Sequence, residues 1–125
     1  MITSLHTMIY SDDAEATRVF FRDVLQWPYV SMDDDWLIFK TGLSEMGVHP
    51  TFSVWEGKEY RHPRHHAVYL MCDDLQATIQ ELQTRGAEFD GEPVDQGYGI
   101  VISMKVPGAD NIELYQPAHP TAFNL

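Results

Sequence analysis

The chain repeats part of itself, and this repeat constrains the fold more than any other feature. The segments DDAEAT (residues 12–17) and DDLQAT (residues 73–78) match at four of six positions and lie 61 residues apart in a chain of 125 residues. Each opens with two aspartates, which favour the start of a helix because a carboxylate accepts hydrogen bonds from free backbone N–H groups. Apolar residues follow at helical spacing. The pattern predicts one amphipathic helix in each half, and Arg85-Gly86 is expected to end the second.

Short apolar runs surround both predicted helices. SLHTMIY (4–10) and HHAVYLMC (65–72) precede them, and three further strand-like runs follow each helix. Both halves therefore fit the order β-α-β-β-β. We predict an α+β fold in which one domain (1–125) holds two βαβββ modules, about 1–57 and 63–119, joined by the polar segment EGKEYRHPR (56–64). A helix covers one face of each mixed or antiparallel sheet, so the bare faces are expected to form a cleft lined by alternate strand residues.

Composition excludes several classes of partner. The net charge of -11 disfavours binding to nucleic acid or to anionic membrane surfaces, and no run of residues has the length and apolarity of a membrane span. The single cysteine, Cys72, has no partner for an internal disulfide. These features predict a cytoplasmic protein. The acidic triplet at 33–35 is interpreted as a solvated hairpin turn, because it lacks the spaced oxygen ligands of a calcium site.

Four segments in this order resemble the vicinal oxygen chelate superfamily. They are LHTMI before the first predicted helix, HHAVYLMC with the second helix, the turn GYG (97–99), and VPGADNIELYQP near the end. This superfamily includes glyoxalase I, type I extradiol dioxygenases and bleomycin resistance proteins. The resemblance implies a glyoxalase-like fold and a homodimer, in which a cleft can be completed by strands from two chains.

The resemblance also implies positions for metal ligands. His6 matches the ligand of the first strand, and Glu113 matches the ligand of the last strand. The expected ligand of the second module falls on Ala67, 61 residues after His6, and alanine cannot bind a metal. His66 lies one residue early and faces the other side of an unbroken strand, whereas His65 shares the parity of Ala67 but lies further out. A β-bulge or a shifted strand start would bring either histidine inward.

Other residues complete the predicted site. His49 matches a possible fourth ligand, within the uncertainty set by the hairpin lengths. Met71 and Tyr69 share the parity of Ala67 and are expected to line the cleft with it, together with Tyr98. Tyr69 is also the candidate catalytic residue, because its hydroxyl can donate a proton or a hydrogen bond.

Two classes of function fit these residues. Two histidines and a carboxylate leave open positions on a metal, so Fe(II) there supports extradiol ring cleavage, and Zn, Ni, Co or Mn supports a glyoxalase- or epimerase-like reaction. The alternative is a metal-free protein that sequesters a small molecule, as bleomycin resistance proteins do. Ala67 favours the binding protein, whereas His6 with Glu113 favours the enzyme. We keep both hypotheses, with a preference for the extradiol-type enzyme acting on a molecule with adjacent oxygens.

Overall fold

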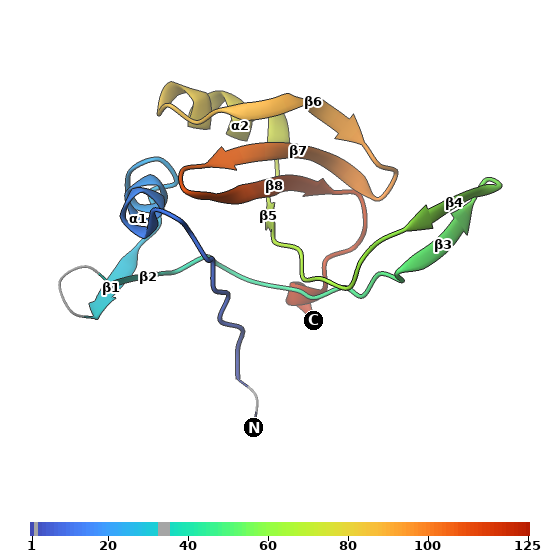
Figure 1. Cartoon of the computed structure of the whole chain (residues 1–125), viewed down its shortest axis with the longest axis horizontal. Helices are drawn as coiled ribbons and strands as arrows, with labels where there is room; N and C mark the ends of the chain where they lie inside the picture. Colours follow the sequence, from blue (N-terminus) through green and yellow to red (C-terminus); the bar gives the residue numbers. More distant parts are fainter. Residues whose placement is uncertain (2, 33–35) are drawn as a thin grey trace.

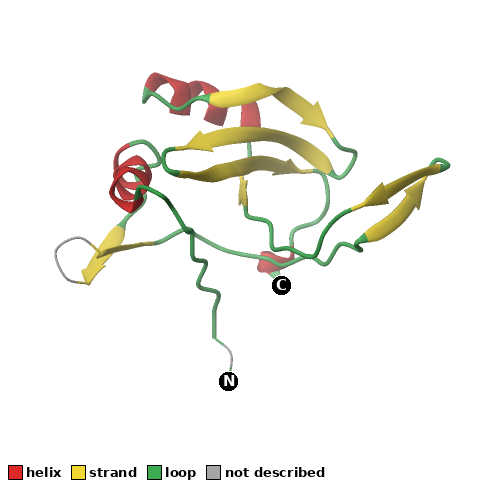
Figure 2. Cartoon of the chain, in the orientation of Figure 1, coloured by secondary structure: helices red, strands yellow, loops and turns green. Residues whose placement is uncertain are grey.

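The computed structural model describes residue 1, residues 3–32 and residues 36–125, so the acidic turn expected at 33–35 lies outside the described residues. The protein has an α+β fold, as predicted (Figures 1 and 2). The elements in chain order are α1 (Ala14–Asp23), β1 (Tyr29–Met32), β2 (Trp36–Phe39), β3 (Phe52–Trp55), β4 (Lys58–Arg61), β5 (Tyr69–Met71), α2 (Leu75–Thr84), β6 (Phe89–Asp95), β7 (Gly99–Val106), β8 (Ala109–Pro117) and the short 3-10 helix η1 (Ala122–Asn124). No helix in the described part of the chain is long and apolar enough to cross a membrane.

The second half of the chain forms the predicted βαβββ unit. Its four strands make one sheet in the order β5-β8-β7-β6, in which β5 runs parallel to β8 and the other neighbours are antiparallel. Asp74 caps α2 by accepting a hydrogen bond from Ala77 N (3.0 Å), as its sequence position predicts. At the other end, Gly86 adopts a φ of 94° and follows the C-cap residue Arg85.

The core lies between α2 and one face of this sheet, with α1 contributing from the side. Alternate residues of β7 and β8 point into it, and Met104 and Leu114 are the largest fully buried side chains. The buried members of the cluster are Phe20, Phe21, Leu75, Ile79, Leu82, Ala87, Ile102, Met104, Val106, Ile112 and Leu114. The opposite face of the same sheet therefore remains available to another layer or to a ligand.

Helix α1 is attached to the tight turn between β7 and β8. Asp12 N donates to Gly108 O (2.7 Å), and the buried hydroxyl of Thr17 donates to Pro107 O (2.5 Å). Asp13 caps the helix by accepting from Ala16 N (3.1 Å), which confirms the first predicted helix start. At the far end of α1, Arg85 Nε donates to Val24 O (2.6 Å), so both helices are linked around the shared core.

The first half differs from the βαβββ order expected for it. Residues 3–11 form no strand, although their sequence pattern predicts one, and β1 pairs with β2 in a separate two-stranded sheet. Strand β3 pairs with β4, which lies in the segment expected to be a connector, through a turn at Glu56 and Gly57, both with positive φ. A strand needs a neighbour for its backbone hydrogen bonds, and residues 3–11 have none among the described residues.

Large apolar side chains of the first half are consequently exposed. Val48 is 96% exposed, Met46 74%, Leu43 73% and Trp55 66%. The segment before α1 runs away from the sheet, and the β3–β4 hairpin projects from the opposite side of the molecule to the β1–β2 hairpin (Figure 1). These segments have apolar strand-like sequences without a core of their own.

Candidate ligand-binding site

The candidate site lies on the sheet face that α2 does not cover, which we call the open face. The strand register places Tyr69 beside Glu113, Met71 beside Tyr115, and Ser103 on the other side of Glu113. Directly paired residues project to the same side of a sheet, so these five side chains share one face. The face opposes the one that carries Met104 and Leu114, because these residues alternate with Ser103 and Glu113 along their strands.

Glu113 sits at the middle of the open face. Its side chain is partly exposed, and within the described part of the chain no hydrogen bond or ion pair to it is found. An ionised carboxylate can accept several hydrogen bonds or pair with a cation. Glu113 is therefore free to receive a ligand group.

Three tyrosines gather beside Glu113 and form what we call the tyrosine cluster: Tyr69, Tyr98 and Tyr115. The rings of Tyr69 and Tyr98 each lie 5.8 Å from the ring of Tyr115, at angles of 64° and 61°. Tyr115 is buried between them and donates its hydroxyl to Tyr98 O (3.2 Å), whereas Tyr69 and Tyr98 are 44% and 52% exposed. Edge-to-face packing holds the central ring in place and leaves the outer two available for contact with a ligand.

Local electrostatics in the tyrosine cluster disfavour negative charge. Burial raises the pKa of Tyr98 above its ordinary value, and the nearby Tyr69 and Glu113 raise it further. Burial also raises the pKa of Tyr115, with added contributions from Tyr98, Glu45 and Tyr69. The phenols of Tyr98 and Tyr115 therefore remain protonated at neutral pH. Tyr115 donates its proton to Tyr98 O, and the Tyr98 hydroxyl can donate to a ligand.

The C-terminal segment closes one end of the cluster. His119 stacks beside Tyr115 with ring centroids 5.8 Å apart, and Ala118 N donates to Tyr98 O (2.9 Å). Glu45, from the loop before β3, accepts a hydrogen bond from Ala122 N (2.7 Å), and one of its oxygens lies 3.6 Å from His119 Nε2. Glu45 thus joins a loop of the first half to the end of the sheet.

The opposite end of the open face is polar. Asn111 donates from Nδ2 to Asp90 Oδ2 (2.5 Å) and to Ser103 Oγ (3.0 Å), and Lys105 Nζ lies 3.7 Å from Asp90 Oδ1. These groups use one another as hydrogen-bond and ion-pair partners. The unpaired Glu113 therefore separates a satisfied polar network from the tyrosine cluster.

The structure does not bring the predicted metal ligands together within one chain. His6 lies exposed in the segment before α1, and His65 and His66 lie exposed before β5 begins at Tyr69. Ala67 is likewise exposed and precedes the strand. Among the described residues, no three His, Cys, Asp or Glu side chains are grouped so that they could hold a metal ion. The donors of a single chain therefore do not fit a metal centre.

His49 has a different neighbour from the one expected. Its ring lies 5.2 Å from the ring of His62, at 85°, and its Nδ1 donates to Pro50 O (2.8 Å). His62 is held there because its backbone N–H donates to Thr51 O (2.8 Å), which extends the β3–β4 ladder. The pair is exposed at the base of this hairpin. His49 is thus placed beside His62, a residue that the sequence argument left out of the site.

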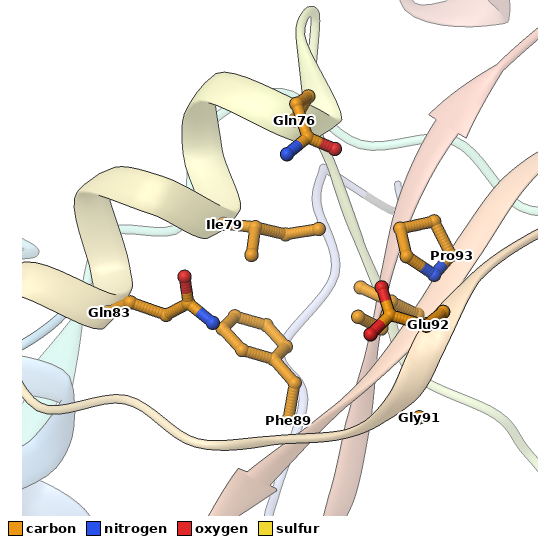
Figure 3. Close-up of a pocket in the computed structure, with 8 residues that line it drawn as sticks. Gln76, Ile79, Gln83, Phe89, Gly91, Glu92 and Pro93 are labelled. Carbon is orange, nitrogen blue, oxygen red and sulfur yellow. The ribbon is translucent and has the colours of Figure 1, made fainter.

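A hollow of about 320 Å³ lies between α2 and β6. It is next to the register shift in the β6–β7 pairing between Asp90 and Val94. Ile79 points into it, Glu92 turns its carboxylate toward it, and Gln83 and Phe89 are also among its lining residues (Figure 3). Ile102, from the core face of β7, also lines it. This hollow is therefore on the other side of the sheet from Glu113 and is separate from the candidate site.

Sequence reasoning left Tyr115 and Glu45 out of the predicted site. Tyr115 has the same parity as Glu113 on β8, so strict use of strand alternation would have found it. Glu45 carries no such signal, because it reaches the site from an irregular loop.

Comparison with known proteins agrees with this fold. The family model of the Glyoxalase/Bleomycin resistance protein/Dioxygenase superfamily matches residues 3–114. The chain belongs to this superfamily, whose members bind small molecules. No match was found among curated protein sequences.

Solved structures show the same fold at low sequence identity. A lactoylglutathione lyase from Agrobacterium tumefaciens is 18% identical with a TM-score of 0.56, and the match covers 91% of this chain and 92% of that one. TnmS3, an antibiotic binding protein from Streptomyces sp. CB03234, is 19% identical with a TM-score of 0.52, covering 94% and 100%. A glyoxalase/bleomycin resistance protein/dioxygenase from Nocardioides is 16% identical with a TM-score of 0.56, covering 96% and 89%.

Proposed function

We propose that this protein binds a small organic molecule on the open face, against the tyrosine cluster and Glu113, without a metal ion as part of the site. The observation that carries the proposal is a carboxylate without a hydrogen-bond or ion-pair partner among the described residues, next to two half-exposed tyrosines on the sheet face that α2 does not cover. Ligand sites of proteins combine apolar and aromatic walls with a few polar groups that fix orientation, and this face has that composition.

The placement of the candidate donors supports a binding protein over a metal enzyme. Ala67 occupies the position where the family resemblance implies a ligand, and neither His65 nor His66 lies on strand β5. Tyr69, the candidate catalytic residue, is paired with Glu113 and lies 5.8 Å from Tyr115, ring to ring. We assign Tyr69 to ligand contact and hydrogen bonding in this proposal.

A second copy of the chain is part of the proposal. The apolar side chains of residues 43–55 that are exposed have no covering layer in the described part of the chain, and β5 and β6 are edge strands of their sheet. Uncovered apolar segments and open strand edges favour association between chains. A homodimer in which the first half of one chain covers the open face of the other would turn that face into an enclosed cleft.

The binding proposal is tested by a screen of aromatic small molecules followed by protein NMR. Ligands of the open face are expected to shift the amide signals of Tyr69, Ser103 and Glu113. Ser103→Trp should block binding by covering the face, whereas Gln83→Trp fills the separate hollow of Figure 3 and should leave binding unchanged. If Gln83→Trp abolishes binding and Ser103→Trp does not, the site has been placed on the wrong side of the sheet.

The dimer is tested by sedimentation equilibrium, with an expected mass of twice the 14.4 kDa of one chain. Val54→Asp introduces a charge on β3 at a side chain that is 58% exposed, and it should weaken the dimer by at least tenfold. Lys58→Asp changes the charge on the partner strand of the same hairpin and serves as the control. A monomer at micromolar concentration for the unsubstituted chain would refute this part of the proposal.

A metal-dependent enzyme of the extradiol or glyoxalase type is the second candidate, and Glu113 is the observation that favours it. The residues that would hold Fe(II), Zn or another divalent ion are Glu113 and either His66 or His65 of one chain, with His6 of a second chain. Such an ion would supply a Lewis acid or a dioxygen-binding centre. Metal analysis of protein purified with Fe(II) separates the candidates, because about one ion per chain that is lost in both His6→Ala and Glu113→Ala would favour the enzyme.

A further inference from the structure

The tyrosine cluster has an electrostatic character that limits which ligands it can hold. Its aromatic faces carry negative potential, Glu113 is an unpaired acceptor, and Glu45 adds a second carboxylate at its end. Among the described residues, the basic side chain found against the cluster is His119, which lies beside Glu45 and the ring of Tyr115. A negatively charged ligand group beside Glu113 or Glu45 would be repelled by these carboxylates.

The lysine and arginine side chains whose contacts the structure describes lie away from the tyrosine cluster. In the described ranges, the cations found over aromatic rings are Arg18 at Trp36, Lys58 at Tyr60 and Arg61 at Phe52, and none of these rings belongs to the cluster. Lys105, at the polar end of the open face, lies beside Asp90. The net charge of -11 adds a favourable long-range potential for cations.

We propose that the molecule bound at the tyrosine cluster carries a positive charge, as a protonated or quaternary amine, and that it rests against Tyr69 and Tyr98 with its charge facing Glu113. A cation within about 6 Å of an aromatic ring centre is attracted to the ring, and a carboxylate at the same place adds a charge pair. The inference rests on the proposed function, because it specifies the ligand of that same site.

The test compares choline with 3,3-dimethylbutan-1-ol, which has the same shape but a carbon atom in place of the charged nitrogen. Both are titrated into the full chain and followed by protein NMR. Choline is expected to bind at least tenfold more tightly, to shift the signals of Tyr69, Tyr98 and Glu113, and to weaken when salt is raised from about 0.05 to 1 M.

Variants identify the groups that recognise the charge. Glu113→Gln should reduce choline affinity about tenfold and leave the neutral alcohol unaffected, and Tyr69→Leu and Tyr98→Leu should each reduce choline affinity severalfold. Glu92→Gln is the matched control, because Glu92 lies at the hollow behind the sheet (Figure 3). Each variant is checked for an unchanged melting temperature, so that loss of folding is not mistaken for loss of contact.

The outcomes separate the inference from the proposed function. Equal affinity for choline and the alcohol, or an unchanged choline affinity in Glu113→Gln, would overturn the inference while open-face binding stands. Absence of choline binding would overturn it as well. In that case the proposed function would still be decided by the aromatic screen with Ser103→Trp and Gln83→Trp.

Discussion

Gly108 offers a quantitative check on how α1 is held against the sheet. The residue adopts a φ of +79°, a conformation that costs an L-residue about 1–2 kcal/mol. A Cβ at this position would lie 2.6 Å from Ser11 Oγ and 2.9 Å from both Asp13 N and Asp13 O. Two of these three atoms are backbone atoms of the α1 N-terminus, so they cannot rotate away. Overpacking of this kind costs about 1–3 kcal/mol, and Gly108→Ala is therefore expected to cost about 2–5 kcal/mol in total.

Gly86→Ala is the matched control for this substitution. Gly86 has a φ of +94°, but a Cβ there would meet nothing within 4 Å, so the backbone cost of about 1–2 kcal/mol is the whole expected effect. The entropy of unfolding is about 2.1 cal/mol/K per residue, so each kcal/mol of lost stability lowers the Tm of this chain by roughly 4 °C. Thermal unfolding followed by circular dichroism, at one fixed protein concentration, should place Gly108→Ala about 4–12 °C below Gly86→Ala. Equal melting temperatures would show that α1 does not contact the β7–β8 turn as described.

Three further substitutions and conditions test other parts of the structure. Met104→Ala should lower the free energy of unfolding by about 2–5 kcal/mol in urea denaturation, because Met104 is 0% exposed and its removal leaves a cavity; a loss below 1 kcal/mol would contradict this burial. Asp74→Ala should cost about 0.5–2 kcal/mol because it removes the cap on Ala77 N, and Asp74→Asn should recover most of this. Burial raises the pKa of the Cys72 thiol, so the native thiol should react with a disulfide reagent at pH 8 much more slowly than the urea-unfolded chain. Because the pKa of Cys72 is higher in the folded chain than in the unfolded chain, the protonated thiol contributes to the free energy of unfolding. This contribution is complete below the unfolded thiol pKa of about 8.5 and is lost as pH rises through the higher folded pKa. Cys72→Ala should therefore reduce the loss of stability at alkaline pH.

The elements that the sequence predicted well are those with local signals. Asp13 and Asp74 begin their helices as expected, and each accepts a hydrogen bond from the backbone N–H three residues later. Tyr69 and Met71 share one face of β5, as strand alternation predicts. These predictions succeeded because helix capping and strand parity depend on residues that are close in the sequence.

The elements that differ from the sequence-based expectation are those whose structure depends on neighbours distant in the sequence. Residues 4–10 form an apolar run of the kind expected for a strand, but Leu5 and Met8 are 53% and 51% exposed without a neighbouring strand in the described part of the chain. His49 was considered as a ligand from an alignment of the two halves, but the β3–β4 pairing places it against His62. Sequence parity assigns a side chain to a face, and it does not determine which strand lies beside it.

In the proposed homodimer, the unequal closure of the two halves would link ligand binding to association between chains. The repeated sequence pattern gives a complete four-stranded sheet in the second half and two separate hairpins in the first, so the open face and the exposed apolar segments lie uncovered in the same chain. If a second copy covers that face, a ligand held at Glu113 contacts both copies, and the two equilibria must influence each other by the same factor. The proposed dimer has two open faces, so a ligand that binds each of them tenfold more tightly than it binds the monomer must strengthen the dimer about a hundredfold at saturation. We expect sedimentation equilibrium with and without ligand to show this linkage, and a dimer constant that is independent of a saturating open-face ligand would place the interface between copies away from the open face.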